Sequence, residues 1–411
     1  MSAGPPELID SIIDCLHNSP RVLKTCTLVA RSWLPRSRVH LFRRLHLHFE
    51  ESSRKPSLNT YLANFRSYIL SNPTIISCVE DLSLDLRVRP SPPSPNDIMD
   101  TVPENLPFTN LKSLDIGKPL YAPTPDASKW RASRILTLIK QNPGLQKLVV
   151  FGCDLGRSDE PEAQDEAELL AYIVTSMPGL QSLRICEFDV PFASIESERS
   201  LLPTPSNPSG HLVSLQTLAI EHCQFGLGQR LFPRTGDLYR LPELVSLVLL
   251  DCNRPDDEGN FQLVNQYPRT IKHLVIALSE MNTEVTNASW AEMSNLTDLV
   301  LYWSTPEQLI TLLQHFLEID TVKLQFLRLN QLFLQSRAAL ALLDAVLAAF
   351  ISQTPSLQRK VAVLPKVNQH NDEFRGLDLT DVFAVFPIAA QSGMVEMATE
   401  TDDLHDMVDE P

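Results

Sequence analysis

Leu244-Val-Ser-Leu-Val-Leu249, Ile271-Lys-His-Leu-Val-Ile276 and Leu296-Thr-Asp-Leu-Val-Leu301 share one pattern. An apolar residue is followed by two variable positions, a leucine, one variable position and another apolar residue. Nine copies, 25 to 35 residues apart, begin at Val79, Leu111, Leu145, Leu180, Leu215, Leu244, Ile271, Leu296 and Leu324. Each interval has room for a strand, a turn, a returning helix and a second turn. The chain is therefore expected to be an α/β solenoid with a parallel sheet.

Two further regularities accompany the pattern. Cys153, Cys223 and Cys252 each stand three residues past the last apolar position of a copy. Prolines precede several expected strands and end the helix before them, at Pro143, Pro178, Pro242, Pro268 and Pro355. The pattern resembles the leucine-rich repeat, a family that places Asn or Cys at this turn to satisfy the backbone. The alternative is an ordinary α/β domain with apolar strands.

Composition and charge limit the classes of function. The 411 residues carry a formal charge of −15, and residues 1–58 hold nine Arg and Lys against five Asp and Glu, which leaves −19 for the remainder. Nucleic acid is therefore not expected as a partner. The longest apolar stretch, Ala338 to Ile351, is broken by Asp344 and predicts a buried helix, not a membrane span. No secretory signal precedes Leu8, so a cytoplasmic or nuclear protein, or both, is expected.

No motif for catalysis or metal binding is found. Seven cysteines form no CxxC pair and no Cys/His array, and there is no nucleophile elbow, phosphate loop or HExxH. His46 and His48 alternate on a strand or helix end, and are interpreted as exposed surface histidines because no third ligand is in view. We expect no catalytic residue, no metal and no cofactor.

The first 47 residues predict three short helices. Leu8, Ile12 and Leu16 form one apolar stripe, residues 21–33 a second amphipathic segment, and residues 38–47 a third. A unit of about 45 residues buries too little surface to be stable alone. Some of its apolar side chains should therefore be covered by a partner or by the next domain.

Four segments of this region resemble an F-box, particularly that of a large fungal group. They are Pro5-Pro6-Glu7-Leu8-Ile9, Ile12-Ile13-Asp14-Cys15-Leu16, Leu28-Val29-Ala30-Arg31-Ser32-Trp33 and His40-Leu41-Phe42-Arg43-Arg44-Leu45. The resemblance covers about residues 4–48, with two departures: Gly4 stands where the family usually has Leu, and Ala30 replaces a common Cys. It implies that an adaptor binds through Pro6, Leu8, Ile12, Leu16, Val29, Trp33 and Leu41.

The rest of the chain divides into three parts. Residues 49–78 are expected to be a helical linker that caps the solenoid, and residues 79–365 the repeats themselves. After Leu357 the pattern degenerates, with Lys360 where Leu is expected. Residues 366–411 are therefore interpreted as a C-terminal extension that ends in an acidic, disordered tail.

A target surface is expected on the inner, concave face of the sheet. Positions between the core-facing leucines project there, and in the C-terminal half they form an apolar stripe with a polar rim. The candidate target-binding residues are Val248, Leu250, His273, Val275, Asp298, Val300, Tyr302, Trp303, Phe326 and Arg328. The alternative is that residues 366–395 fold back and cover the stripe.

Together the two resemblances imply the substrate receptor of a Skp/cullin/F-box ubiquitin ligase, acting in ubiquitin-dependent degradation. The implied partners are a Skp-type adaptor, through it a cullin, and a protein target; neither nucleic acid nor a membrane is expected. The chain would contribute binding and proximity, not catalysis. The alternatives are a non-catalytic F-box scaffold and a leucine-rich-repeat module that binds proteins without ubiquitin transfer.

Overall fold

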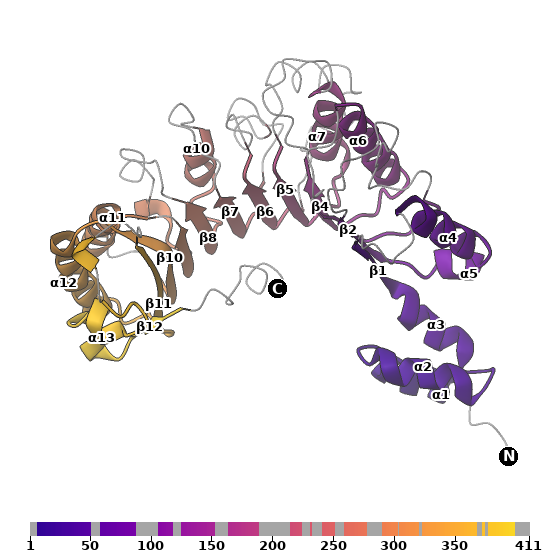
Figure 1. The fold of residues 1–411 in the computed structure, drawn as a ribbon, viewed down its shortest axis with the longest axis horizontal. Coiled ribbons are helices and arrows are strands. Elements are labelled where there is room, and N and C mark those ends of the chain that lie inside the picture. Colours follow the sequence, from indigo (N-terminus) through magenta and orange to yellow (C-terminus); the bar gives the residue numbers. More distant parts are fainter. Residues whose placement is uncertain are drawn as a thin grey trace. The chain divides into compact units, whose positions relative to one another are not determined.

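The computed structural model describes residues 6–50, 58–87, 106–117, 125–152, 163–188, 214–223, 231, 241–250, 259–277, 290–302, 304–319, 323–367, 372–374 and 377–398. The chain divides into two compact units, which are described separately. Unit 1 comprises residues 1–180 and 188–205, and unit 2 comprises residues 181–187 and 206–411. Both units are α/β, with parallel strands in sequence order and helices between them (Figure 1).

Unit 1 begins with three short helices, α1 (Pro6–Cys15), α2 (Pro20–Val29) and α3 (Leu34–Arg43). Its strands are β1 (Arg44–Glu50), β2 (Asp81–Arg87), β3 (Ser113–Ile116) and β4 (Lys147–Phe151), all paired in parallel. The helices that follow these strands are α4 (Leu58–Leu70), α5 (Pro73–Ile76), α6 (Pro125–Lys140) and α7 (Ala163–Ser176).

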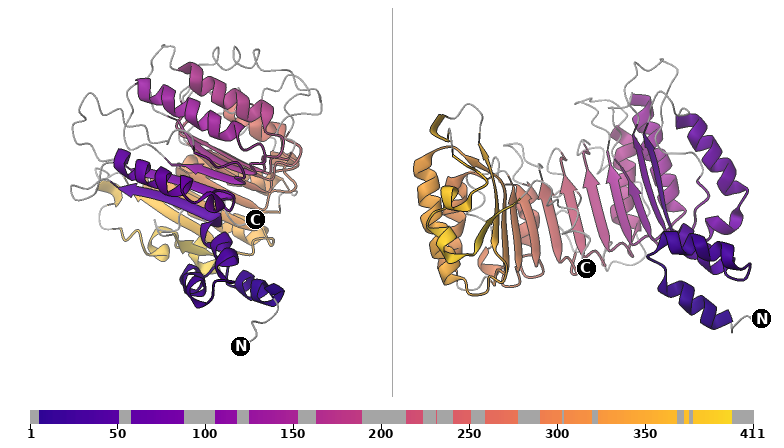
Figure 2. Two further views of the ribbon diagram at one scale, coloured as in Figure 1. Left: turned by 90° about the vertical axis from the view of Figure 1, so that its right-hand side faces the viewer. Right: turned by 60° about the horizontal axis from the view of Figure 1, so that its bottom comes forward.

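Unit 2 has the same alternation. Its strands are β5 (Ser182–Cys186), β6 (Thr217–Glu221), β7 (Ser246–Leu250), β8 (His273–Ala277), β9 (Asp298–Tyr302), β10 (Phe326–Leu334), β11 (Val361–Val367) and β12 (Val395–Met397). Its helices are α10 (Gly259–Gln266), η3 (Trp290–Glu292), α11 (Pro306–Glu318), α12 (Arg337–Gln353), η4 (Asp372–Phe374), α13 (Val382–Val385) and η5 (Ala389–Ser392). In each unit the helices that connect the strands lie on one side of them (Figure 2).

All nine predicted strands are confirmed, and each begins two residues after the start of its motif. The second motif residue explains the alignment. The Gln216 carbonyl accepts hydrogen bonds from the N–H groups of Val245 and Ser246, at 2.8 and 2.9 Å. The same pair of bonds recurs at Glu80, Lys112, Gln181, Val245, Lys272 and Thr297. Adjacent copies are therefore held in parallel register without slippage.

The predicted helix ends and the turn cysteine are also found. Pro143, Pro178, Pro268 and Pro355 follow the last residues of α6, α7, α10 and α12 by two or three positions. Cys223 is buried, and its thiol donates to the carbonyl oxygens of Glu221 and Ile185, at 3.2 and 3.6 Å. It thus ties its turn to the preceding strand. Cys153 and Cys252 lie outside the described residues.

The apolar stretch around residues 338–351 forms most of α12, as predicted. Its N-cap Ser336 accepts a hydrogen bond from the Ala339 N–H, which satisfies a backbone donor of the first turn. Leu340, Leu343, Leu347 and Phe350 face inward, while Leu342 is exposed. Among the described residues, no helix has both the length and the apolar character that crossing a bilayer requires.

The parallel strands extend beyond residues 79 and 365, the predicted ends of the repeats. At the N-terminal end, Phe42-Arg-Arg-Leu45-His-Leu47 has the repeat spacing, and β1 pairs with β2 over seven residues. The segment predicted as the third helix therefore ends as a strand. The predicted linker 49–78 contains α4 and α5, which connect β1 to β2 as the helices of a repeat do.

At the C-terminal end the repeat resumes after a one-residue insertion. The Gln325 carbonyl accepts from the N–H groups of Gln358 and Arg359, but the strand pairing aligns Arg328 with Ala362, one residue further on. Val361 and Val363 consequently become the buried strand residues, and Lys360 is displaced from the core. Residues 377–398 then pack against α12 and add β12 to β11. This described part of the extension continues the parallel sheet.

Candidate functional site

The three N-terminal helices leave several apolar side chains in water. Leu8 and Ile12, four residues apart on α1, are 58% and 48% exposed, and Val29 at the end of α2 is 60% exposed. Val22 and Leu28 on α2 are exposed as well, Leu28 at 86%. Isolated exposed apolar residues are common, but five within 22 residues are a large exposed apolar area for such a small unit.

A charged contact holds α1 to α3 beneath this surface. Arg36 donates two hydrogen bonds to the Asp14 carboxylate, at 2.5 and 2.6 Å, and the His40 Nε2 lies 2.7 Å from the same group. Arg36, and secondarily His40, hold the pKa of the Asp14 carboxyl well below its usual range. The contact fixes the angle between α1 and α3, with Ile13 and Leu23 buried in the small core.

The predicted adaptor residues differ in their environment. Leu8, Ile12 and Val29 are exposed as a binding role requires, whereas Leu16, Trp33 and Leu41 are half-buried. The side chain of Pro6 lies outside the described residues. Sequence analysis did not include Val22 and Leu28 in this set, although α2 gives a signal: its buried face is Leu23 and Cys26, and both residues lie off it.

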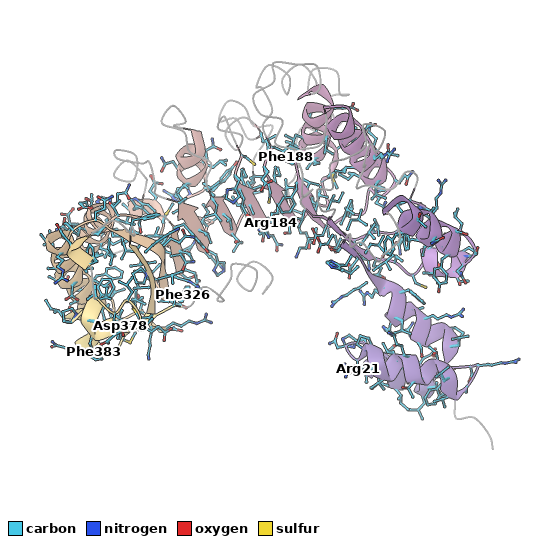
Figure 3. The ribbon with its side chains drawn as sticks, viewed as in Figure 1. Arg21, Arg184, Phe188, Phe326, Asp378 and Phe383 are labelled. Atoms are coloured by element: carbon cyan, nitrogen blue, oxygen red, sulfur yellow. The ribbon has the colours of Figure 1, made fainter. Side chains whose placement is uncertain are left out.

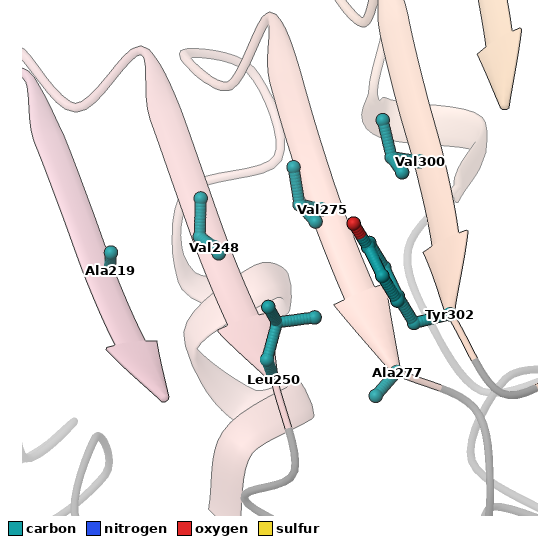
Figure 4. Close-up of a cluster of buried hydrophobic side chains, with 7 residues drawn as sticks. All are labelled: Ala219, Val248, Leu250, Val275, Ala277, Val300 and Tyr302. Atoms are coloured by element: carbon teal, nitrogen blue, oxygen red, sulfur yellow. The ribbon is translucent and has the colours of Figure 1, made fainter. Parts of the chain in front are cut away.

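On unit 2, the predicted target stripe is one cluster on the sheet face opposite the helices (Figure 4). Val248, Val275 and Val300 occupy matching positions of β7, β8 and β9. Leu250, Ala277 and Tyr302 form the next row, and Figure 4 shows the Tyr302 ring lying beside Val275. Ala219 completes the cluster, and Phe326 packs against it.

The expectation that this stripe is exposed is wrong. Val248, Leu250, Val275, Val300 and Tyr302 are all buried, Tyr302 being 9% exposed and the others less. Side chains at matching positions of parallel strands stand about 4.8 Å apart, so large residues in adjacent strands shield one another from water. The alternative, that residues 366–395 cover the stripe, is not supported either, because their described part packs against α12 and β11.

The polar rim is the accessible part of this surface. His273 Nδ1 lies 2.9 Å from the Asp298 carboxylate, and His273 is half exposed. Desolvation opposes ionisation of Asp298, but hydrogen bonds from His273 and Thr297 outweigh it and lower the pKa of that carboxyl. Arg328 donates to the Asn330 side chain at 2.8 Å. Trp303 lies outside the described residues.

Phe326 connects the rim to the apolar cluster. Its ring, labelled in Figure 3, is half-buried against the cluster. The guanidinium of Arg359 lies over the ring, 5.8 Å from its centre. A cation over an aromatic face adds electrostatic attraction to the hydrophobic contact. The surface of unit 2 at β8 to β10 thus presents ionic and aromatic groups beside a packed apolar cluster.

No model of a protein family matches the chain, and no curated protein matches it. The exposed apolar helices of unit 1 and the rim of unit 2 are therefore the features from which a function can be inferred.

Two further groups of charged residues come together only in the folded chain. Arg184 of β5, labelled in Figure 3, forms an ion pair at 2.8 Å with the buried Glu221 of β6. The Cys186 thiol lies 3.8 Å from the same carboxylate. Burial raises the pKa of the Cys186 thiol, which is therefore inert.

On unit 1, Asp85 of β2 lies close to His46 and His48 of β1. The sequence alone did not place Asp85 near the two histidines. The pairing of β1 with β2 brings it beside them.

Proposed function

We propose that the chain is the substrate-recognition subunit of a Skp/cullin/F-box ubiquitin ligase. Residues 4–48 are the F-box that binds the adaptor, and the parallel strands are leucine-rich repeats that bind a protein target. The observation that carries the proposal is the exposed apolar surface of α1 and α2. It coincides with the segment whose sequence resembles an F-box, and a helical unit this small needs a partner to cover it.

The energetics favour a stable complex. Fully burying a leucine or valine side chain contributes about 1.5–3 kcal/mol, so covering the exposed parts of Leu8, Leu28 and Val29 contributes about 1–2 kcal/mol each. A few such residues dominate most protein interfaces. The Asp14 contact with Arg36 orders α1 and α3 beforehand, which lowers the entropic cost of binding.

The second half of the proposal concerns the target. The rim of His273, Asp298, Phe326 and Arg328 offers a donor, an acceptor, an aromatic ring and a cation, while the adjacent cluster is apolar. Accessible polar groups and an aromatic ring of this kind are typical of protein-binding surfaces, although the apolar cluster itself is buried. The receptor would hold its target near the ubiquitin-charged enzyme, and catalysis would be proximity supplied by the complex. The cytoplasm and the nucleus are the compartments where such ligases work.

Co-purification with a Skp-type adaptor tests the first half. The full chain should bind the adaptor at one to one, and Leu8→Asp with Leu28→Asp should abolish binding, because both side chains are exposed and a buried carboxylate costs several kcal/mol. Leu342→Asp on α12 is the matched control: Leu342 is equally apolar and 53% exposed, but lies in unit 2. Failure of the intact chain to bind, or equal loss in the control, would exclude the F-box assignment.

A measurement of ubiquitin transfer distinguishes a ligase receptor from a scaffold without ubiquitin transfer. A target captured by the adaptor-bound chain should disappear in a ubiquitin-dependent manner, and Arg328→Glu should weaken its capture without affecting adaptor binding. Adaptor binding without any loss of the captured protein would favour the non-catalytic scaffold.

A further inference from the structure

His46, His48 and Asp85 share one face of unit 1. In β1, Leu45 and Leu47 alternate with the two histidines, and Leu47 is buried on the helix side. The histidines therefore project from the opposite side of the sheet. Strand pairing aligns His48 with Asp85 of β2, which places the carboxylate directly beside the imidazole.

The side chains are close enough to share an ion. His48 Nδ1 lies 3.0 Å from the Asp85 carboxylate, and the two imidazole rings stack with centres 6.1 Å apart and an interplanar angle of 16°. One ligand atom from each of the three residues lies within 4.8 Å of the other two. Among the described residues, this is the one group of three or more His, Cys, Asp or Glu with such geometry.

These distances suit a tetrahedral metal ion. Ligand atoms about 2.0–2.1 Å from zinc stand about 3.4 Å from each other. The His48 and Asp85 atoms, 3.0 Å apart, are near this spacing. The His46 ligand atom lies within 4.8 Å of the other two, so it needs to move by no more than about 1.4 Å to reach it. Both histidines are exposed and free to rotate without disturbing the core.

We propose that His46, His48 and Asp85 bind a divalent transition-metal ion, with zinc the best match to the ligand set. Two imidazoles and one carboxylate favour zinc, cobalt, nickel or copper over magnesium and calcium, which prefer oxygen ligands alone. Three protein ligands leave a fourth position for water or for a side chain of a bound protein.

A second histidine–aspartate pair in the chain can be compared with His48 and Asp85. His273 and Asp298 of unit 2 form an ion pair at 2.9 Å with exposures of 49% and 20%, against 3.0 Å, 49% and 23% for His48 and Asp85. The difference is the second histidine: His46 stands two residues before His48, whereas the residues two before and two after His273 are Ile271 and Val275. Both units therefore contain a histidine–aspartate pair. Among the described residues, a group of three potential ligands is found only in unit 1.

The test is a titration of the full chain, freed of metal by a chelator, with Zn²⁺ by calorimetry and with Co²⁺ by visible absorption. One ion should bind, and Co²⁺ should give the visible bands of a four-coordinate site. His46→Gln and His48→Gln should each weaken binding by about 10- to 100-fold or more. His273→Gln should leave the affinity and stoichiometry unchanged.

Several outcomes would overturn the site. They are no binding by the intact chain, binding that survives the His46→Gln, His48→Gln double variant, or equal weakening by His273→Gln. Asp85→Asn tests whether the carboxylate is a ligand. An unaltered affinity for the metal ion would show that it is not. Far-UV circular dichroism checks the fold; because His46 and His48 are both exposed, either single variant decides the question if the other is misfolded.

Discussion

Asn142, the residue that follows α6 and Gln141, is expected to be one of the most sensitive polar positions of unit 1. It is 1% exposed, and its side chain makes three hydrogen bonds. Its amide donates to the carbonyls of Phe108 and Leu138, at 2.9 and 2.8 Å, and its oxygen accepts from the Leu111 N–H at 2.8 Å. The bonds to Phe108 and Leu111 reach the preceding repeat, so Asn142 joins two copies through their backbones.

Asn142→Ala should destabilise unit 1 by about 3–5 kcal/mol. Each lost hydrogen bond contributes about 1 kcal/mol net, and a buried N–H or C=O left unpaired costs about 1–3 kcal/mol. The Leu111 N–H and the Phe108 carbonyl are the groups left unpaired. At about 2–4 °C per kcal/mol for a unit of this size, the unfolding midpoint should fall by on the order of 10 °C.

Asn72→Ala is the matched control. Asn72 also precedes a proline, its backbone N–H bonds three residues back at 2.9 Å, and its side chain donates to the carbonyl four residues back at 2.8 Å. These are the local bonds of Asn142 without the two long-range ones. Asn72→Ala should therefore cost about 1 kcal/mol. Thermal unfolding of both variants, followed by circular dichroism, makes the comparison; equal shifts would refute the role assigned to the bonds between repeats.

Other predictions concern charged groups and thiols. Arg184→Met should destabilise unit 2 by about 3–5 kcal/mol in urea unfolding, because it leaves the Glu221 carboxylate buried and unpaired, and adding Glu221→Leu should recover most of the loss; a larger loss in the double variant would contradict this. The pKa of the Asp14 carboxyl is lowered in the folded chain, so its stabilising contribution is present above the ordinary value of 3.8 and is lost as the pH falls below it. Asp14→Asn should accordingly flatten the acid unfolding curve between about pH 5 and pH 2, and an unchanged curve would exclude the contact as its cause. Cys186 should resist alkylation at pH 8 while exposed Cys15 reacts, a difference that mass spectrometry of the native chain would detect.

The strand positions were predictable because the repeat motif records both burial and register. A leucine such as Leu247 is inside, and the backbone two residues earlier bonds to the next copy, so nine strands followed from nine motifs. The strand at Leu45 and Leu47 was missed for a local reason. The same residues form the end of the segment that resembles an F-box. Their spacing was therefore interpreted as the third helix and not as a repeat strand. The strand at Val361 was missed because a single inserted residue shifts the burial pattern by one position.

The candidate site was less predictable. Alternation along β7 to β9 does assign Val248 and Tyr302 to one face, but burial depends on what packs beside them in three dimensions. Asp85 lies 37 residues after His48, and nothing in the spacing of these residues links them. Their contact follows from the register of β1 against β2, which sequence alone did not supply.

The junction between α3 and β1, at Arg43 and Arg44, limits where the chain can be cut to transplant its N-terminal helices. The last residue of α3 already accepts a hydrogen bond from the Glu80 N–H, and the next residue begins β1. A transplant cut at residue 48, where the F-box resemblance ends, would carry a strand away with the helices. It would leave β2 as an open edge ready to pair with foreign chains. The three N-terminal helices and the first strand of the sheet are thus one continuous structural piece.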